Sequence, residues 1–262
     1  MKKIVLILLV FTLSLFANNL VLGVVPQQSP LVLSKKWLEV ANYLKQHTGL
    51  NVIFSTEKSI PEFEKTLYEG FYDIAYMNPY HFIVANKKQN YNAFLRADKD
   101  IIGILVSKRK DINFEDKNFL KDKRFLFPAP NAFAATLLTK FELKKIYNFD
   151  IDKEAKVLYV NSHDSVYKGI SRDIGYLGGG IVRTFNNFSD IKDKNSLNIV
   201  YKTKSYPSHP FAYHPRVSKD VIERFEIAIL NMPEDLKKLL SIKNFKKIDS
   251  SEYDVIKDIN IK

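Results

Sequence analysis

The chain has 262 residues, of which 46% are hydrophobic and 26% charged, and it contains no cysteine. This composition supports a buried core and excludes a disordered polyelectrolyte, and the length allows one large α/β domain or two lobes. The absence of cysteine excludes disulfides, thiolate metal sites, a cysteine nucleophile and a lipid-modified N-terminal cysteine.

The formal net charge is +11, from 40 basic and 29 acidic residues, and only seven of the basic residues are arginine. The lysines are scattered along the chain, whereas nucleic-acid-binding surfaces more often concentrate arginine together with exposed aromatic residues. We therefore expect no nucleic-acid partner. The lysines either solvate the surface or attract anions weakly toward a cleft.

Residues 1–17 have the pattern of a secretory signal peptide. Lys2 and Lys3 precede an apolar run that ends at Ala17, and the run is shorter than the roughly 20 residues of a membrane-spanning helix. Leu15 occupies a position where a small residue is usual, so the cleavage site stays open and an uncleaved anchor is the alternative. The pattern predicts a soluble periplasmic protein that is not a lipoprotein.

Strand and helix patterns alternate along the rest of the chain. Strands are expected at 20–25, 50–54, 72–76, 91–96, 101–107, 124–127, 156–160, 174–177 and 198–201, and helices at 34–47, 61–68, 79–88, 131–147, 164–171, 219–231 and 233–240. This alternation is typical of open, mostly parallel sheets. It predicts two α/β lobes, the first from residues 18–105 with 206–262 and the second from residues 106–205.

Polar residues gather where the expected strands meet the following helices, which is where open α/β sheets bind ligands. The candidate ligand-binding residues at these junctions are Gln27, Tyr76, Asn78, Tyr80, Asn131, Ala132, Phe133, His163, Asp164, Gly178 and Gly179. A helix start also offers unpaired N–H groups to an anion. Each residue has a structural interpretation as well, since Asn131 and Asp164 suit helix caps, tyrosines suit packing and glycines suit close contacts.

No catalytic, cofactor or metal motif accompanies these junctions. His163 precedes Asp164, but adjacent side chains rarely face each other and no serine elbow is present. His209 and His214 lack a clear third metal ligand, and the chain has no P-loop and no dinucleotide-binding glycine pattern. The polar junctions therefore favour reversible binding without a catalytic residue, a cofactor or a metal.

Several segments taken together resemble the phosphate/phosphite/phosphonate-binding proteins of ABC transporters. They are GVVPQQSP followed by KKWLEVANYLKQHTG, then YEGFYDIAYMNPYHF, NSHDSVYKGI and YPSHPFAYHPRVSKDVIERFEIAILNM, and they cover nearly the whole mature chain in the order of the family. The resemblance implies a type II periplasmic binding protein fold, in which two α/β lobes joined by two crossing segments close on a ligand.

The resemblance also implies where the ligand contacts lie. The contacts of the family fall on the region of Tyr76 and Tyr80, on the helix start at 131–133 and on His163. The helix start of phosphonate-binding members is rich in serine and threonine, but here it reads Pro-Asn-Ala-Phe-Ala-Ala. Backbone N–H groups and the Asn131 amide are therefore left to hold an oxyanion.

Two further differences from the family bear on the ligand. Aminophosphonate-binding members place a carboxylate near the strand end where this chain has glycine at 178–180, so we do not expect a ligand amine to be recognised. Phe133 adds an apolar wall that leaves room for a hydrocarbon-bearing anion.

The expected function is that of a monomeric solute-binding protein of an ABC importer. It would bind a small oxyanion of the phosphonate, phosphite or phosphate type, or an organic anion, and deliver it unchanged to an inner-membrane permease. The alternative is a sensor module that presents its ligand to a histidine kinase. An enzyme with His163 as a base is the third class, and it lacks an orienting group.

Overall fold

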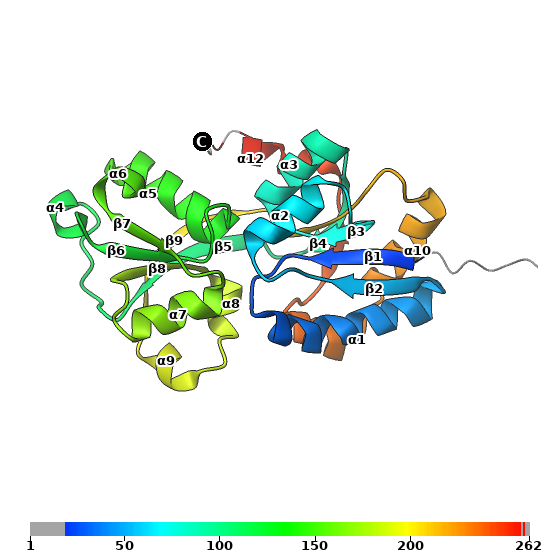
Figure 1. Ribbon diagram of the computed structural model, residues 1–262, viewed down its shortest axis with the longest axis horizontal. Coiled ribbons are helices and arrows are strands. Elements are labelled where there is room, and N and C mark those ends of the chain that lie inside the picture. Colours follow the sequence, from blue (N-terminus) through cyan, green and yellow to red (C-terminus); the bar gives the residue numbers. More distant parts are fainter. Residues whose placement is uncertain (1–18, 258, 260–262) are drawn as a thin grey trace, which may run out of the picture.

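The computed structural model describes residues 19–257 and 259, so the expected signal peptide lies outside the described residues. They form two α/β lobes that lie side by side, each built around one sheet (Figure 1). Within these residues, no helix combines the length and the apolar character that crossing a membrane requires.

The first lobe holds both ends of the described chain. Its elements are β1 (Asn19–Val24), α1 (Pro30–Thr48), β2 (Asn51–Ser55), α2 (Ile60–Tyr68), β3 (Ile74–Tyr76), α3 (Pro79–Gln89), β4 (Asn92–Ala97), β10 (Pro210–Tyr213), α10 (Lys219–Leu230), α11 (Glu234–Leu240), β11 (Phe245–Lys247), the 3₁₀ helix η2 (Ser250–Tyr253) and α12 (Asp254–Lys257). The strand order is β11-β4-β10-β3-β1-β2, with β1 parallel to β2 and β3.

The second lobe lies between β4 and β10 in the chain. Its elements are β5 (Ile101–Ser107), α4 (Lys117–Leu120), β6 (Arg124–Phe127), the π-helix η1 (Phe133–Leu138), α5 (Thr139–Tyr147), α6 (Ile151–Glu154), β7 (Lys156–Tyr159), α7 (His163–Ser171), β8 (Leu177–Ile181), α8 (Val182–Asn186), α9 (Ile191–Asn195) and β9 (Asn198–Tyr206). The strand order is β7-β6-β8-β5-β9.

The chain passes between the two sheets at residues 98–100 and again at 207–209. All of β5, from residue 101 on, pairs with β8 or β9 of the second sheet, so the expected boundary between residues 105 and 106 falls inside this strand. The division of the chain into lobes at residues 105 and 205 stays a prediction.

Most of the expected elements are present, and the largest difference concerns the strand expected at 174–177. The structure places this strand, β8, at Leu177–Ile181, so Gly178, Gly179 and Gly180 lie within the strand and do not follow it. They are buried because α7 and η1 cover the two faces of β8. The proline-rich segment also contains β10, which the alternation pattern missed because prolines flank it.

Two glycines allow the helix after β6 to lie directly on the second sheet. A Cβ atom on Gly103 would lie 2.1 Å from the carbonyl oxygen of Ala134, and one on Gly179 would lie 2.2 Å from that of Ala135. Any larger residue at either position would push η1 away from the sheet. Gly103 of β5 and Gly179 of β8 therefore set the position of the helix start that faces the first lobe.

The lobes share apolar contacts in addition to the two crossing segments. One buried cluster contains Val25, Ile60 and Met77 of the first lobe together with Ala132 and Phe133 of the second. Since burial of apolar area favours contact, this cluster stabilises the arrangement in which the lobes touch.

We predict that Gly179→Ala lowers the free energy of unfolding by about 2–3 kcal/mol, because the new methyl group meets backbone that cannot rotate away. Urea unfolding of the wild type and the variant measures the change. Gly169→Ala is the matched control, since its Cβ meets only the end of the Leu126 side chain and the helix gains about 1 kcal/mol of propensity. Equal stability of the two variants would contradict the packing role of Gly179.

Candidate functional site

A small cavity lies between the lobes, and we call it the interlobe cavity. Its volume is about 10 Å³, and it is lined by Val25, Gln27, Ile60, Asn78, Ile101, Ala132, Phe133, Ala134, Ala135, His163, Ile181 and His209. A space of this size holds roughly one water molecule. The lining contains amide, imidazole and backbone groups, and no carboxylate.

His163 reaches the cavity from the start of α7 in the second lobe. Ser162 caps this helix, its hydroxyl accepting from the N–H of Ser165 at 3.1 Å, and the N–H of His163 donates to the carbonyl of Gln27 in the first lobe at 3.3 Å. The imidazole is 3% exposed and its Nδ1 has no hydrogen-bond partner. Burial, together with the charge of Arg183, lowers the pKa of His163 to about 3, so the ring is neutral at pH 7.

His209 faces the same cavity from the segment that joins β9 to β10. Its ring stacks on Tyr76 with 5.4 Å between the ring centroids, and its Nδ1 also has no partner. Burial lowers the pKa of His209 well below its usual value, and the charges of Arg183, His81 and His163 act in the same direction. Two neutral imidazoles therefore line one space, each with an unused ring nitrogen.

Backbone N–H groups complete the lining on the second lobe. Ala132 precedes η1 without a side-chain cap, and the first N–H groups of a helix have no intrahelical acceptor. Phe133 is 1% exposed and its ring contacts Tyr206 edge-on, so it closes one side of the space with an apolar wall. The chain thus presents N–H donors at the place where the phosphonate-binding family is rich in hydroxyl groups.

The amides of Asn78 and Asn131 bridge the lobes. The Asn78 side chain caps α3 by accepting from the N–H of His81 at 2.8 Å, and it donates to the carbonyl of Asn131 at 3.1 Å. The Asn131 amide donates to Glu64 at 3.1 Å, and the other oxygen of Glu64 lies 3.0 Å from Nε2 of His81. Asn131 is therefore engaged with Glu64 and does not cap a helix, and its role as a ligand contact stays a prediction.

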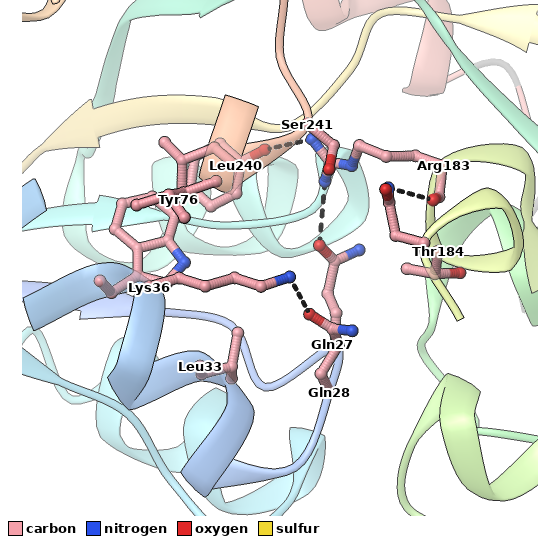
Figure 2. Close-up of a pocket in the computed structure, with 12 residues that line it drawn as sticks. Gln27, Gln28, Leu33, Lys36, Tyr76, Arg183, Thr184, Leu240 and Ser241 are labelled. Carbon is pink, nitrogen blue, oxygen red and sulfur yellow. Dashed lines mark hydrogen bonds between the residues drawn. The ribbon is translucent and has the colours of Figure 1, made fainter. Parts of the chain in front are cut away.

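Arg183 is a positively charged side chain that reaches from the second lobe to the first beside the cavity lining. It lies on α8 and donates to the hydroxyl of Tyr76 at 2.9 Å and to the side-chain carbonyl of Gln27 at 3.0 Å (Figure 2). Among the described residues, no carboxylate forms an ion pair with Arg183. Its positive charge is thus left uncompensated at the boundary between the lobes.

Six of the expected site residues are outside the lining of the interlobe cavity: Tyr76 and Asn131, whose contacts are given above, and four more. Tyr80 is half-buried on α3, and burial followed by the charge of Glu64 raises its pKa. Asp164 is half-buried beside Gln28 and Lys36 of the first lobe, and burial is the main cause of its raised pKa. Gly178 and Gly179 pack inside the second sheet against side chains and backbone. Their assignment as ligand contacts stays a prediction.

Sequence reasoning missed Arg183 as a site residue and weighed His209 only as a metal ligand. With β8 ending at Ile181, Arg183 stands two residues after the carboxyl end of a strand, the position that marks ligand sites in such sheets. Because the strand was expected to end at residue 177, Arg183 did not stand out as a residue that follows a strand. Within residues 19–257 and 259, no group of three His, Asp or Glu side chains is arranged to hold a metal ion.

Comparisons with known proteins match this fold. A sequence model of the family described as "ABC transporter, phosphonate, periplasmic substrate-binding protein" matches residues 22–253. The structure of PhnD1 from Prochlorococcus marinus in complex with methylphosphonate is similar with a TM-score of 0.84 at 17% identity, covering 93% of this chain and 97% of that one. A binding protein component of an ABC phosphonate transporter from Pseudomonas aeruginosa gives a TM-score of 0.80 at 14% identity, covering 92% and 85%.

A more distant likeness is to the VFT2 domain of BvgS from Bordetella pertussis. The TM-score is 0.55 at 16% identity, covering 85% of this chain and 92% of that domain. At this identity the likeness is one of fold alone, and the sensor alternative stays a prediction.

The buried histidines predict a specific pH dependence of stability. Because the pKa of His163 is lower in the folded chain than in the unfolded chain, the unfolded state takes up the proton first, and stability falls as the pH drops below about 6.5. We expect His163 to contribute a loss of about 2 kcal/mol between pH 7 and pH 5. Urea unfolding at both pH values should show a correspondingly smaller loss in His163→Gln, and an unchanged loss would contradict the assignment.

Proposed function

The chain belongs to the family of phosphonate periplasmic substrate-binding proteins of ABC transporters, and on this premise we propose that it captures a small phosphonate or related oxyanion at the interlobe cavity. The observation that carries the proposal is the uncompensated charge of Arg183 behind two neutral imidazoles with unused nitrogens. A space lined by donors and without a carboxylate favours an anion.

The proposed contacts come from both lobes. His209 and Asn78 belong to the first lobe or to its connection, and His163 and the N–H groups at the start of η1 belong to the second. A neutral imidazole donates one N–H, and its other nitrogen takes up a proton when a nearby anion raises its pKa. An oxyanion held this way completes hydrogen bonds that the protein alone leaves unmade.

Capture requires the lobes to move. The interlobe cavity has room for about one water molecule, so a phosphonate group enters only when the lobes separate about the segments at 98–100 and 207–209. Hinged closure on a ligand is a common mode of binding in two-lobed proteins. Closing brings Arg183 toward Tyr76 and Gln27 again, with the cleft wider than in the described structure by the volume of the ligand, and contacts of Arg183 with the first lobe then stabilise the occupied state.

The proposal extends to the fate of the ligand. We infer that the chain acts as a monomer in the periplasm and passes the ligand unchanged to an ABC permease in the inner membrane. The family supports this role, and His163 has no orienting carboxylate at its Nδ1 of the kind a general base needs. Titration calorimetry with methylphosphonate, phosphite, phosphate and sulfate tests the class of ligand, and binding of none of them would contradict it.

We predict that Arg183→Met weakens methylphosphonate binding at least about tenfold. The variant loses the bonds to Tyr76 and Gln27 that favour lobe closure, and a hydrogen bond to a charged group contributes about 1.5–3 kcal/mol. Titration calorimetry measures the dissociation constants. Arg172→Met is the matched control, since it removes the same charge from an exposed position of the same lobe, 3.9 Å from Asp193. Equal losses in the two variants would show a general charge effect and contradict the role of Arg183.

The lining also predicts discrimination against amines. We expect 2-aminoethylphosphonate to bind at least about tenfold more weakly than propylphosphonate, which has nearly the same size, because no carboxylate lines the interlobe cavity and Arg183 repels a cation. Competition between the two compounds in one titration checks this. Tighter binding of the amine would place an unrecognised acidic group, such as Glu64, in contact with the ligand.

A further inference from the structure

We propose that a second cavity beside His209 receives the organic substituent of the ligand, so that the substrates of this chain are phosphonates with an uncharged hydrocarbon group of several carbon atoms. This inference rests on the proposed function. The second cavity has a volume of about 430 Å³, within the range of pockets that hold small molecules. The interlobe cavity, by contrast, has room for about one water molecule in the described arrangement of the lobes.

The two cavities share a wall. Ile101, Ile181 and His209 line both of them, and all three side chains are at least nine-tenths buried. Ile101 begins β5, Ile181 ends β8 and His209 lies in the return crossing, so the wall is made by segments that meet where the lobes join. An anion bound at His163 and His209 therefore lies next to the second cavity.

The floor of the second cavity is apolar. Ala97, Ile242, Ile101 and Ile181 are all buried and line it. Binding is favoured when a hydrocarbon group replaces water at an apolar surface of this kind. An inorganic oxyanion makes no use of such a surface, whereas an alkyl or aryl phosphonate does.

The rim of the second cavity disfavours a positively charged substituent. Both carboxylates of the rim have partners. Asp100 forms an ion pair with Arg96 at 3.1 Å, and Asp98 accepts a hydrogen bond from the amide of Asn244 at 3.2 Å. Lys99 and Lys243 are exposed on the same rim, and neither has an ion-pair partner among the described residues. The charges and the floor together favour an uncharged hydrocarbon group.

The test compares methylphosphonate with n-butylphosphonate by titration calorimetry on the chain that begins after the expected signal peptide. Each buried methylene adds about fourfold in affinity, so full burial of three would add about 60-fold, and we expect at least tenfold tighter binding of n-butylphosphonate. In Asn186→Trp, whose new ring at the rim occupies the second cavity, the ratio of the two affinities should fall to about one. Asn195→Trp, exposed on α9, is the matched control and should keep the wild-type ratio.

The outcomes separate this inference from the proposed function. Binding of methylphosphonate with no gain for n-butylphosphonate would overturn the inference and leave the proposed function intact. A gain that persists in Asn186→Trp would also overturn it, because the substituent would then lie elsewhere. Failure of every phosphonate to bind would overturn the proposed function and the inference with it.

Discussion

The hydrogen bonds of one guanidinium join the two lobes where they meet, and among the described residues this group, Arg183, has no ion-pair partner. Arg183 is half-buried and donates to Tyr76 and Gln27, bonds that only contact between the lobes provides. The same charge helps to keep His163 and His209 neutral. The cleft therefore combines the positive charge of Arg183 with two ring nitrogens that have no hydrogen-bond partner, which is the basis of the proposed anion site.

The second constraint is the close approach of backbone to backbone in the second lobe. Gly103 and Gly179 let the carbonyls of η1 touch the sheet, and this contact fixes the helix start against the first lobe. The phosphonate-binding family, which this chain resembles in sequence, uses hydroxyl side chains at this start. Here Ala132 and Phe133 have no side-chain hydroxyl, so the proposed contacts at this start are backbone N–H groups and the nearby imidazoles.

Lobe contact in this protein depends on several weak interactions of different kinds. Apolar packing favours closure in general, whereas the bonds of Arg183, Asn78 and Asn131 require one particular alignment of the lobes. None of these bonds is strong on its own, since each replaces bonds to water. Contact between the lobes therefore depends on the sum of these interactions.

The sequence by itself determined the alternation of strands and helices, the two α/β lobes and the family, because hydrophobic period, caps and segment order are local properties of a chain. It also placed His163 at a helix start. Only the tertiary structure decided that Gly178 and Gly179 pack against neighbouring segments, that Asn131 pairs with Glu64, and that Arg183 and His209 line one cavity. These roles depend on segments up to 156 residues apart, which no local pattern relates, and on burial, which sets the charge of an imidazole.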